Sequence, residues 1–327
     1  MLMTLNSRIS SLALSLAAAC WAATAAADSG GNALSNGAGS HNARGCEATA
    51  IAVMVAEPTV SKMAGPLNIV ATYDTTVTPA RQVVLDRAIA EWEAIVEESG
   101  STPGTYPISF TFNSFGPGST LIGNSSTTFN ATSGNLISSA ISFNTDVTWF
   151  VDPSPADDSE FNGGSPPAGF DLLTVARHEI GHALGWIVAP RTTNLTSGGA
   201  FDSPRLNIAT VTVGGFHVDP SWLPNDLMVP ATNQSTRRSI SLYPTSSMSA
   251  RAYGYRIPMQ FIDPSNNGAQ TGTANEPWRT IATALATSPI GLPLLLANLT
   301  HNVPVGYSTA SFHVLDAARG GALVVAP

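Results

Sequence analysis

Two histidines placed four residues apart, His178 and His182, impose the strongest constraint on how this chain can fold. In an α-helix, side chains at positions i and i+4 lie on one face, about one turn apart. The flanking residues favour such a helix, which would begin after Asp171, a preferred N-cap residue, and extend to about Leu184. Gly185 can then redirect the chain through a left-handed turn. Two imidazoles one helical turn apart suit a tetrahedral zinc ion.

Glu179 lies next to the first histidine and is offset around the helix from both. Its carboxylate can therefore sit beside a metal without joining it, where it can take a proton from zinc-bound water. The pattern HExxH is short enough to arise by chance on a solvated helix. Here the glycine that follows the motif and the export signal described below favour a zinc site, with Glu179 as the catalytic base.

The segment His178–Gly185 resembles the zinc-binding helix of the metzincin peptidases, whose pattern HExxHxxGxxH is followed later by a methionine turn. The resemblance implies an α+β catalytic domain with a twisted sheet, an active-site helix and that turn. The chain departs from the pattern at Val188, which stands at the position of the third ligand and cannot bind zinc. A catalytic zinc has three protein ligands and one open position, so the third ligand must come from elsewhere.

His217 is the leading candidate for the third zinc ligand. The segment after it resembles the leishmanolysin branch of the metzincins, in which an insertion separates the glycine from the third histidine. Residues 186–216 would then be the insertion, and Met228 would belong to the methionine turn beneath the metal. Asp202 and Asp219 remain alternatives, because carboxylates also bind zinc.

Met228 also has a second interpretation, as an ordinary residue of the core, since methionine often fills gaps between other side chains. Its sequence neighbours Asp226 and Leu227, rather than its own chemistry, favour the methionine turn.

The N-terminus reads as a cleaved signal peptide over residues 1–27, with a positive charge, an apolar run and small residues before the cleavage point. We therefore expect a secreted protein, extracellular or at the cell surface. Residues 28–64 are rich in small and polar residues and are expected to form a disordered leader. Cys46, the only cysteine left after cleavage, could cap a zinc ion and keep an enzyme latent. A solitary thiol in a flexible leader is the favoured interpretation.

The catalytic domain is expected over residues 65–258. A strand near 67–73 is followed by a helix that starts at Thr78-Pro79 and ends at Gly100, and then by strands at 108–113 and 140–150.

An acidic loop precedes the zinc helix. Its carboxylates could hold a calcium ion, but a solvated loop is favoured; these residues are Asp152, Asp157, Asp158 and Glu160.

Residues 259–327 differ in character and loosely resemble the first coil of a right-handed parallel β-helix. A single coil cannot bury its own apolar face, and no sequence repeat follows it before Pro327. This segment is therefore either a truncated solenoid or a small appendage, and an unremarkable tail is as well supported.

The net charge of −8, with one lysine (Lys62) and scattered arginines, argues against a nucleic-acid partner. The apolar runs are too short for stable membrane insertion. The expected function is that of a secreted zinc-dependent endopeptidase with a polypeptide substrate. The alternative is an adhesin or carbohydrate-binding surface protein that carries a degenerate, catalytically weak zinc domain.

Overall fold

The structure is a computed structural model. The signal peptide expected over residues 1–27 lies outside the part of the chain that it describes. The described residues are 44–54, 66–97, 105–161, 165–187, 196–197, 200–203, 206–210, 217–218, 220, 225–240, 252–255, 260–273, 276–287, 294–296, 300–303, 314–317 and 322–325.

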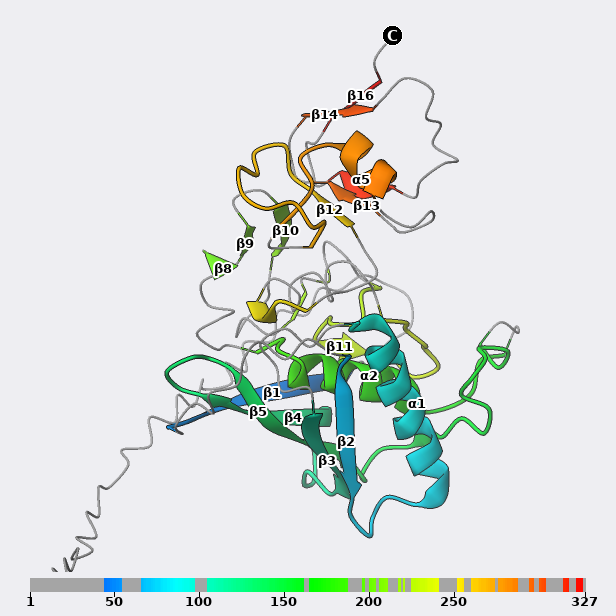
Figure 1. The fold of residues 1–327 in the computed structure, drawn as a ribbon. Helices are drawn as coiled ribbons and strands as arrows, with labels where there is room; N and C mark the ends of the chain where they lie inside the picture. The colour runs from blue at the N-terminus through cyan, green and yellow to red at the C-terminus, as the bar shows by residue number, and fades with distance from the viewer. Residues whose placement is uncertain are drawn as a thin grey trace, which may run out of the picture. The chain divides into compact units, whose positions relative to one another are not determined.

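A six-stranded sheet of order β11-β1-β4-β5-β3-β2 forms the centre of the fold (Figure 1). Its strands are β1 (Arg44–Val53), β2 (Asn68–Tyr73), β3 (Thr105–Asn113), β4 (Leu121–Asn130), β5 (Leu136–Asn144) and β11 (Ala231–Thr232). Strands β2, β3 and β5 run parallel to one another, and β4 runs antiparallel to β5. Strand β1 runs parallel to β4 and antiparallel to β11.

The alternation of side chains along β3 shows which face of the sheet is covered. Tyr106, Ile108, Phe110 and Phe112 are buried, whereas the residues between them are exposed or half-buried. Because successive side chains of a strand point to opposite faces, one face packs on the core and the other faces solvent. The covered face carries the two main helices, α1 (Pro79–Ile95) and α2 (Leu172–Ala183) (Figure 1).

Helix α1 begins as expected, with Thr78 as its N-cap and Pro79 at the first helical turn. Its buried face consists of Val84, Leu85, Ala88, Ile89 and Trp92. The helix ends at Ile95, one turn before the expected end at Gly100, and the N–H of Val96 still donates to the carbonyl of Trp92 (2.9 Å).

Helix α2 lies at the centre of the molecule, and each of its twelve residues is buried. The expected start is confirmed: the Asp171 carboxylate caps the helix by accepting from the Thr174 N–H (3.0 Å). Arg177, at the helix centre, donates from Nη2 to Glu91 of α1 (2.8 Å), which joins the two helices. The hydroxyl of Tyr106 donates to the carbonyl of Ala183 (2.8 Å) and satisfies one of the last helical carbonyls.

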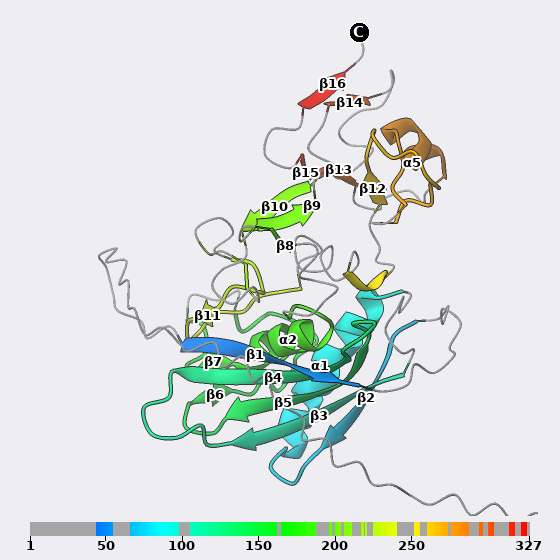
Figure 2. The same ribbon diagram turned by 90° about the vertical axis from the view of Figure 1, so that its left-hand side faces the viewer.

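Strand β1 contradicts the expectation of a disordered leader over residues 28–64. Residues 44–53 form the strand, and Cys46 and Ala48 are buried in the core. The other residues of this leader, except Met54, lie outside the described part of the chain. Cys46 is therefore not a thiol in a flexible segment. Figure 2 shows β1, in blue, beside β4 along the sheet.

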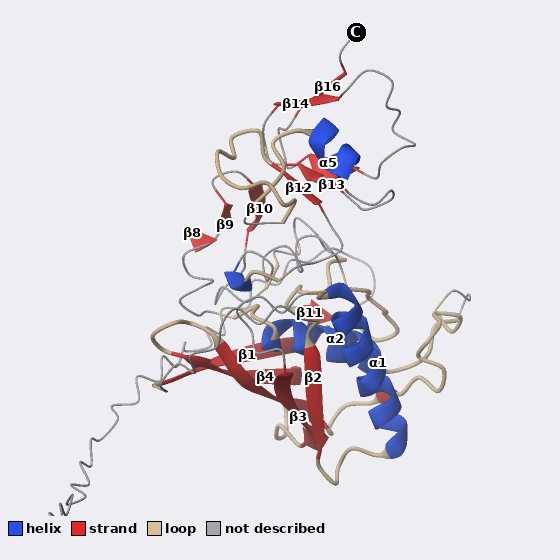
Figure 3. Cartoon of the chain, in the orientation of Figure 1, coloured by secondary structure: helices blue, strands red, loops and turns tan. Residues whose placement is uncertain are grey.

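The chain also forms several short strands (Figure 3). The strand expected over 140–150 is divided, because β5 ends at Asn144 and a short strand follows it after a turn. The short elements are β6 (Trp149–Phe150), β7 (Phe170–Asp171), β8 (Thr196–Ser197), β9 (Ala200–Ser203) and β10 (Leu206–Thr210). Strands β8, β9 and β10 form an antiparallel sheet, and β6 pairs with β7 in parallel.

The C-terminal segment contains parallel strand pairs. Its elements are β12 (Gln260–Ile262), α5 (Ile281–Thr287), β13 (Leu294–Leu296), β14 (Thr300–Val303), β15 (Val314–Ala317) and β16 (Ala322–Val325). Strand β13 pairs in parallel with β12 and β15, and β14 pairs in parallel with β16. Successive passes of the chain are thus paired in parallel, although no residue pattern repeats between them. The β-helix itself stays a prediction.

None of the described helices has the length and the apolar character needed to cross a membrane.

Candidate metal centre

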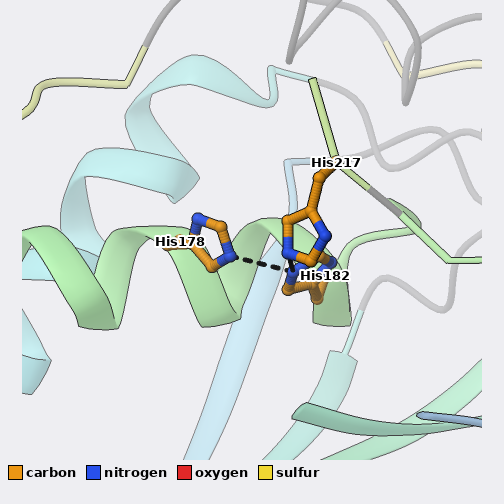
Figure 4. A group of neighbouring side chains, drawn as sticks. All are labelled: His178, His182 and His217. Atoms are coloured by element: carbon orange, nitrogen blue, oxygen red, sulfur yellow. Dashed lines mark hydrogen bonds between the residues drawn. The ribbon is translucent and has the colours of Figure 1, made fainter. Parts of the chain in front are cut away.

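Three buried imidazoles converge at one point of the structure (Figure 4). His178 and His182 project from consecutive turns of α2, and His217 approaches from a separate segment of the chain. The Nε2 atom of His182 lies 2.9 Å from Nε2 of His178 and 3.3 Å from Nε2 of His217. The structure therefore brings together the three residues that the sequence singled out as metal ligands.

The remaining ring nitrogens of the α2 histidines face backbone carbonyls. Nδ1 of His178 lies 2.7 Å from the carbonyl oxygen of Leu227, and Nδ1 of His182 lies 2.6 Å from that of Trp186. A carbonyl oxygen only accepts hydrogen bonds, so each Nδ1 must carry the proton. Each Nε2 then has a free lone pair, directed at the point where the three rings meet.

The electrostatic surroundings keep these imidazoles neutral. Burial lowers the pKa of His178 to about 4. Burial and the neighbouring histidines hold the pKa values of His182 and His217 well below the ordinary value for histidine. Neutral imidazole is the form that binds metal ions.

The nitrogen positions fit a zinc ion. Two nitrogens that are each about 2 Å from a tetrahedral zinc lie about 3.3 Å apart. The Nε2–Nε2 separations of 2.9 Å (His182 to His178) and 3.3 Å (His182 to His217) are close to this spacing. Three protonated imidazoles would repel one another at such distances, whereas a shared divalent cation would hold them there. The donor set therefore suits a tetrahedral metal with one position left for water.

Met228 packs against α2 at Gly181, the residue before the second histidine of the helix. A Cβ atom at Gly181 would come within 2.7 Å of the Met228 sulfur, so glycine is required for this close approach. The N–H of Met228 donates to the Asp226 carboxylate (2.8 Å), and its carbonyl accepts from the N–H of Val218 (2.8 Å). The second bond ties Met228 to the residue after His217, so the turn fixes the backbone that carries the third imidazole.

Glu179 is fully buried, on the side of α2 that faces the sheet. Within the described part of the chain, neither carboxylate oxygen has a hydrogen-bond partner of ordinary geometry. Gly123 of β4 leaves the space that the carboxylate fills, since a Cβ atom there would overlap Oε1. Burial raises the pKa of Glu179 well above its usual value, and the adjacent Cys46 thiol lowers it in part.

Cys46 closes the other side of the Glu179 carboxylate. Its Sγ, a carboxylate oxygen of Glu179 and a ring nitrogen of His178 lie within 4.8 Å of one another. Burial, together with the Glu179 carboxylate, raises the pKa of Cys46 well above its usual value, so the thiol stays protonated.

The two rival ligands lie at positions whose side chains the structure does not describe. Asp202 lies in β9, but the position of its side chain is not described, and Asp219 lies outside the described residues, as does Val188.

The acidic loop before α2 is organised by an arginine. Arg237 donates to Asp152 (2.6 Å), Asp158 (3.0 Å) and Asp171 (2.9 Å), and these carboxylates raise its pKa further. Asp152 is buried, so a solvated loop is the wrong description for it. A calcium site is not supported either, because Asp152 and Asp158 already bind the guanidinium group and the loop carboxylates form no metal-ligating cluster among the described residues.

The sequence did not reveal two contacts of Glu179. One is with Gly123, and the other is with Cys46, which lies in a strand of the sheet. A glycine within a strand signals only a bulge or a close approach of another group, and not which group approaches. Cys46 was visible as a lone thiol, but nothing in the composition of its segment indicated that it would join the sheet.

No protein-family model matches the chain, and neither does any curated protein sequence. The similarity to metzincins therefore rests on the residues of the site.

Proposed function

We propose that this protein is a secreted zinc endopeptidase of the metzincin type, with His178, His182 and His217 as metal ligands and Glu179 as the catalytic base. The observation that carries the proposal is the convergence of three neutral Nε2 atoms, from two separate segments, beside a buried carboxylate. Such a carboxylate without partners is costly to bury unless a cation or a proton compensates it.

The side chains divide the work of peptide hydrolysis. A bound zinc ion would supply Lewis-acid polarisation of the scissile carbonyl and would acidify a water molecule. The carbonyls of Leu227 and Trp186 hold the α2 imidazoles in the tautomer that presents Nε2. Glu179 then accepts a proton from the attacking water at a carboxylate oxygen and delivers it to the leaving amine.

The raised pKa of Glu179 suits this role. A carboxylate of ordinary pKa is a weak base at neutral pH, and burial makes it a stronger one. A neighbouring divalent cation would lower this pKa again, so that the group is ionised before the reaction and still basic enough to accept the proton.

A matched pair of variants tests the proposal. Glu179→Gln keeps the shape of the side chain but removes its basicity, so we expect full zinc binding with casein hydrolysis reduced by about 100-fold or more. Glu160→Gln, a change in the acidic loop, should leave both unaffected. One zinc per chain would be measured by atomic absorption. Hydrolysis by Glu179→Gln at the wild-type rate would refute the assignment.

A surface adhesin or carbohydrate-binding protein with a degenerate zinc domain is the second candidate. The observation that favours it is the stack of parallel strand pairs in the C-terminal segment, since stacked coils form extended binding faces. Stoichiometric zinc without chelator-sensitive casein hydrolysis would favour this candidate.

A further inference from the structure

Arg238 is attached to helix α2 through its backbone. Its N–H donates to the Thr174 hydroxyl (2.8 Å), and its carbonyl accepts from Nη1 of Arg177 (2.8 Å). Thr174 and Arg177 lie one turn apart on α2, and Arg177 directly precedes His178. The backbone of Arg238 is therefore held against the helix that carries two of the three imidazoles.

The side chain of Arg238 reaches from the helix to the turn formed by residues 226–231. Its Nη1 donates to the carbonyl of Ala231 (3.1 Å) at the end of this turn. Burial lowers the pKa of Arg238, and the attraction of the Asp226 carboxylate opposes this change. Asp226 itself accepts from the N–H of Met228 (2.8 Å). One guanidinium group thus acts on both ends of the turn.

Leu227 lies between these two ends, and its carbonyl is the group that orients His178. The carbonyl oxygen is 2.7 Å from Nδ1 of the imidazole. Such a hydrogen bond selects the tautomer with a free Nε2 and fixes the direction of the ring. A displacement of the turn would therefore change the direction in which His178 presents its lone pair.

A small cavity beside the imidazole shows why the turn needs this support. Thr174, His178, Leu227 and Arg238 are all among the residues that line it. Side chains at the wall of a cavity lack contacts on that side, so packing alone holds them less firmly than in a filled core. Hydrogen bonds and charge attraction from a planar guanidinium group restrict the same movement.

The preceding arginine has a separate task. Arg237 donates to Asp171, the N-cap of α2 (2.9 Å), and to Asp152 (2.6 Å), so it fixes the start of the helix. Of these two consecutive arginines, Arg238 is the one that lines the cavity next to Leu227. The chain after the turn therefore supports the metal centre at two different points.

We propose that Arg238 is a positioning residue of the metal centre, which holds the 226–231 turn against α2 so that the Leu227 carbonyl keeps His178 in its metal-binding orientation. The inference rests on the metal centre of the function proposed above and adds to it a residue outside the ligand set. It assigns a role to a charged side chain that the hydrolytic mechanism does not use.

Three variants test the proposal through metal affinity. Arg238→Gln should weaken zinc binding by about tenfold, the lower end of the effect of groups that orient metal ligands. Arg238→Lys keeps the charge beside Asp226 but not the planar fork, so it should recover part of the loss. Arg87→Gln is the matched control, because Arg87 pairs with Glu91 on the helix surface, and it should bind zinc as wild type does. Competition with a chromophoric chelator measures all three.

A second control separates positioning from a general loss of stability. Val84→Ala removes buried methyl groups from α1, away from the turn, and destabilises the core. Cobalt(II) replaces zinc in tetrahedral sites, and its visible absorption reports the ligand geometry. The cobalt spectrum should change in Arg238→Gln and stay as in wild type in Val84→Ala. Equal changes in spectrum and zinc affinity in these two variants would show that the arginine acts only through stability, and the inference would be wrong.

The imidazole itself provides a measurement that needs no metal. Nitrogen-15 NMR of His178 in the metal-free protein should show a single tautomer, with the proton on Nδ1, in the wild type and a mixture of tautomers in Arg238→Gln. If the wild type binds no metal, the proposed function fails, yet this difference would still support the inference. An unchanged His178 tautomer together with unchanged zinc affinity in Arg238→Gln would overturn it. If that variant does not fold, the same comparison is made with Arg238→Lys.

Discussion

Helix α2 carries Glu179, and strand β1 approaches its carboxylate through Cys46, but the core holds the two elements in different ways. All twelve residues of α2 are buried, and its ends are fixed by Asp171 and by the hydroxyls of Tyr106 and Tyr255. Strand β1 buries two small residues and leaves most of its length half-buried or exposed. Helix α2, which carries His178 and His182, is thus buried along its whole length, whereas β1 is held mainly by its backbone hydrogen bonds.

This difference separates an element that stabilises the core from one that buries little apolar surface. A side chain on α2 cannot change without disturbing the core around it. A side chain on β1 can change with little effect on the rest of the sheet, because few apolar contacts depend on it. The predictions that follow test this contrast.

The largest effect is expected from removal of the third imidazole. His217→Ala leaves α2 intact but reduces the donor set to two nitrogens. We expect zinc affinity to fall by more than the roughly 10–100-fold that changes outside the ligand shell cost. Competition with a chromophoric chelator would measure the loss. Asp202→Ala is the control, and a larger loss in that variant would identify the carboxylate as the true ligand.

A pair of isoleucines compares the two elements directly. Ile180 of α2 is fully buried, whereas Ile51 of β1 is 43% exposed. Ile180→Ala should lower the free energy of unfolding by about 3 kcal/mol, through lost burial and a residual cavity. Ile51→Ala should change it by less than about 0.5 kcal/mol. Urea unfolding of both variants measures the contrast, and equal losses would show that β1 belongs to the core.

Gly123 tests the contact between the sheet and the Glu179 carboxylate. Gly123→Ala places a methyl group where Glu179 now lies, while the imidazoles are untouched. We expect normal zinc content, with kcat lowered by roughly 10–100-fold because a small displacement of a reacting group is costly. The control is Thr128→Ala, farther along β4. A kcat equal to wild type would show that Glu179 moves freely and needs no such space.

Helix α2 could be predicted from the sequence because the residues that define it are close together in the chain. Asp171, the apolar positions and Gly185 define a helix within one short stretch of sequence, and the i, i+4 histidines give it a chemical purpose. Leu227 and Gly181 could not be assigned in the same way. Their roles depend on contacts between segments that are far apart along the chain, and a single sequence does not encode those distances.

Strand β1 shows the opposite case. Its segment, RGCEATAIAV, follows a stretch of glycine, serine and asparagine, and it lacks the strong alternation that identifies a strand. It is ordered because β4 and the segment around Pro230 supply hydrogen-bonding partners on both sides. Local composition therefore predicted disorder, and the tertiary context determined the structure. The parallel pairs of the C-terminal segment were missed for a similar reason, because no residue pattern repeats between the paired strands.

Arg44 allows the smallest and most specific change. It begins β1 and donates from Nη1 to the carbonyl of Ser119 (2.8 Å). Arg44→Ala should cost less than about 1 kcal/mol of unfolding free energy, the usual value of one such hydrogen bond. If β1 detaches independently of the core, Arg44→Ala should still increase the rate of maleimide labelling of Cys46 severalfold, measured in a Cys20→Ser background. If labelling accelerates only in proportion to global unfolding, then β1 opens together with the sheet and α2, and the two elements do not differ in the way described here.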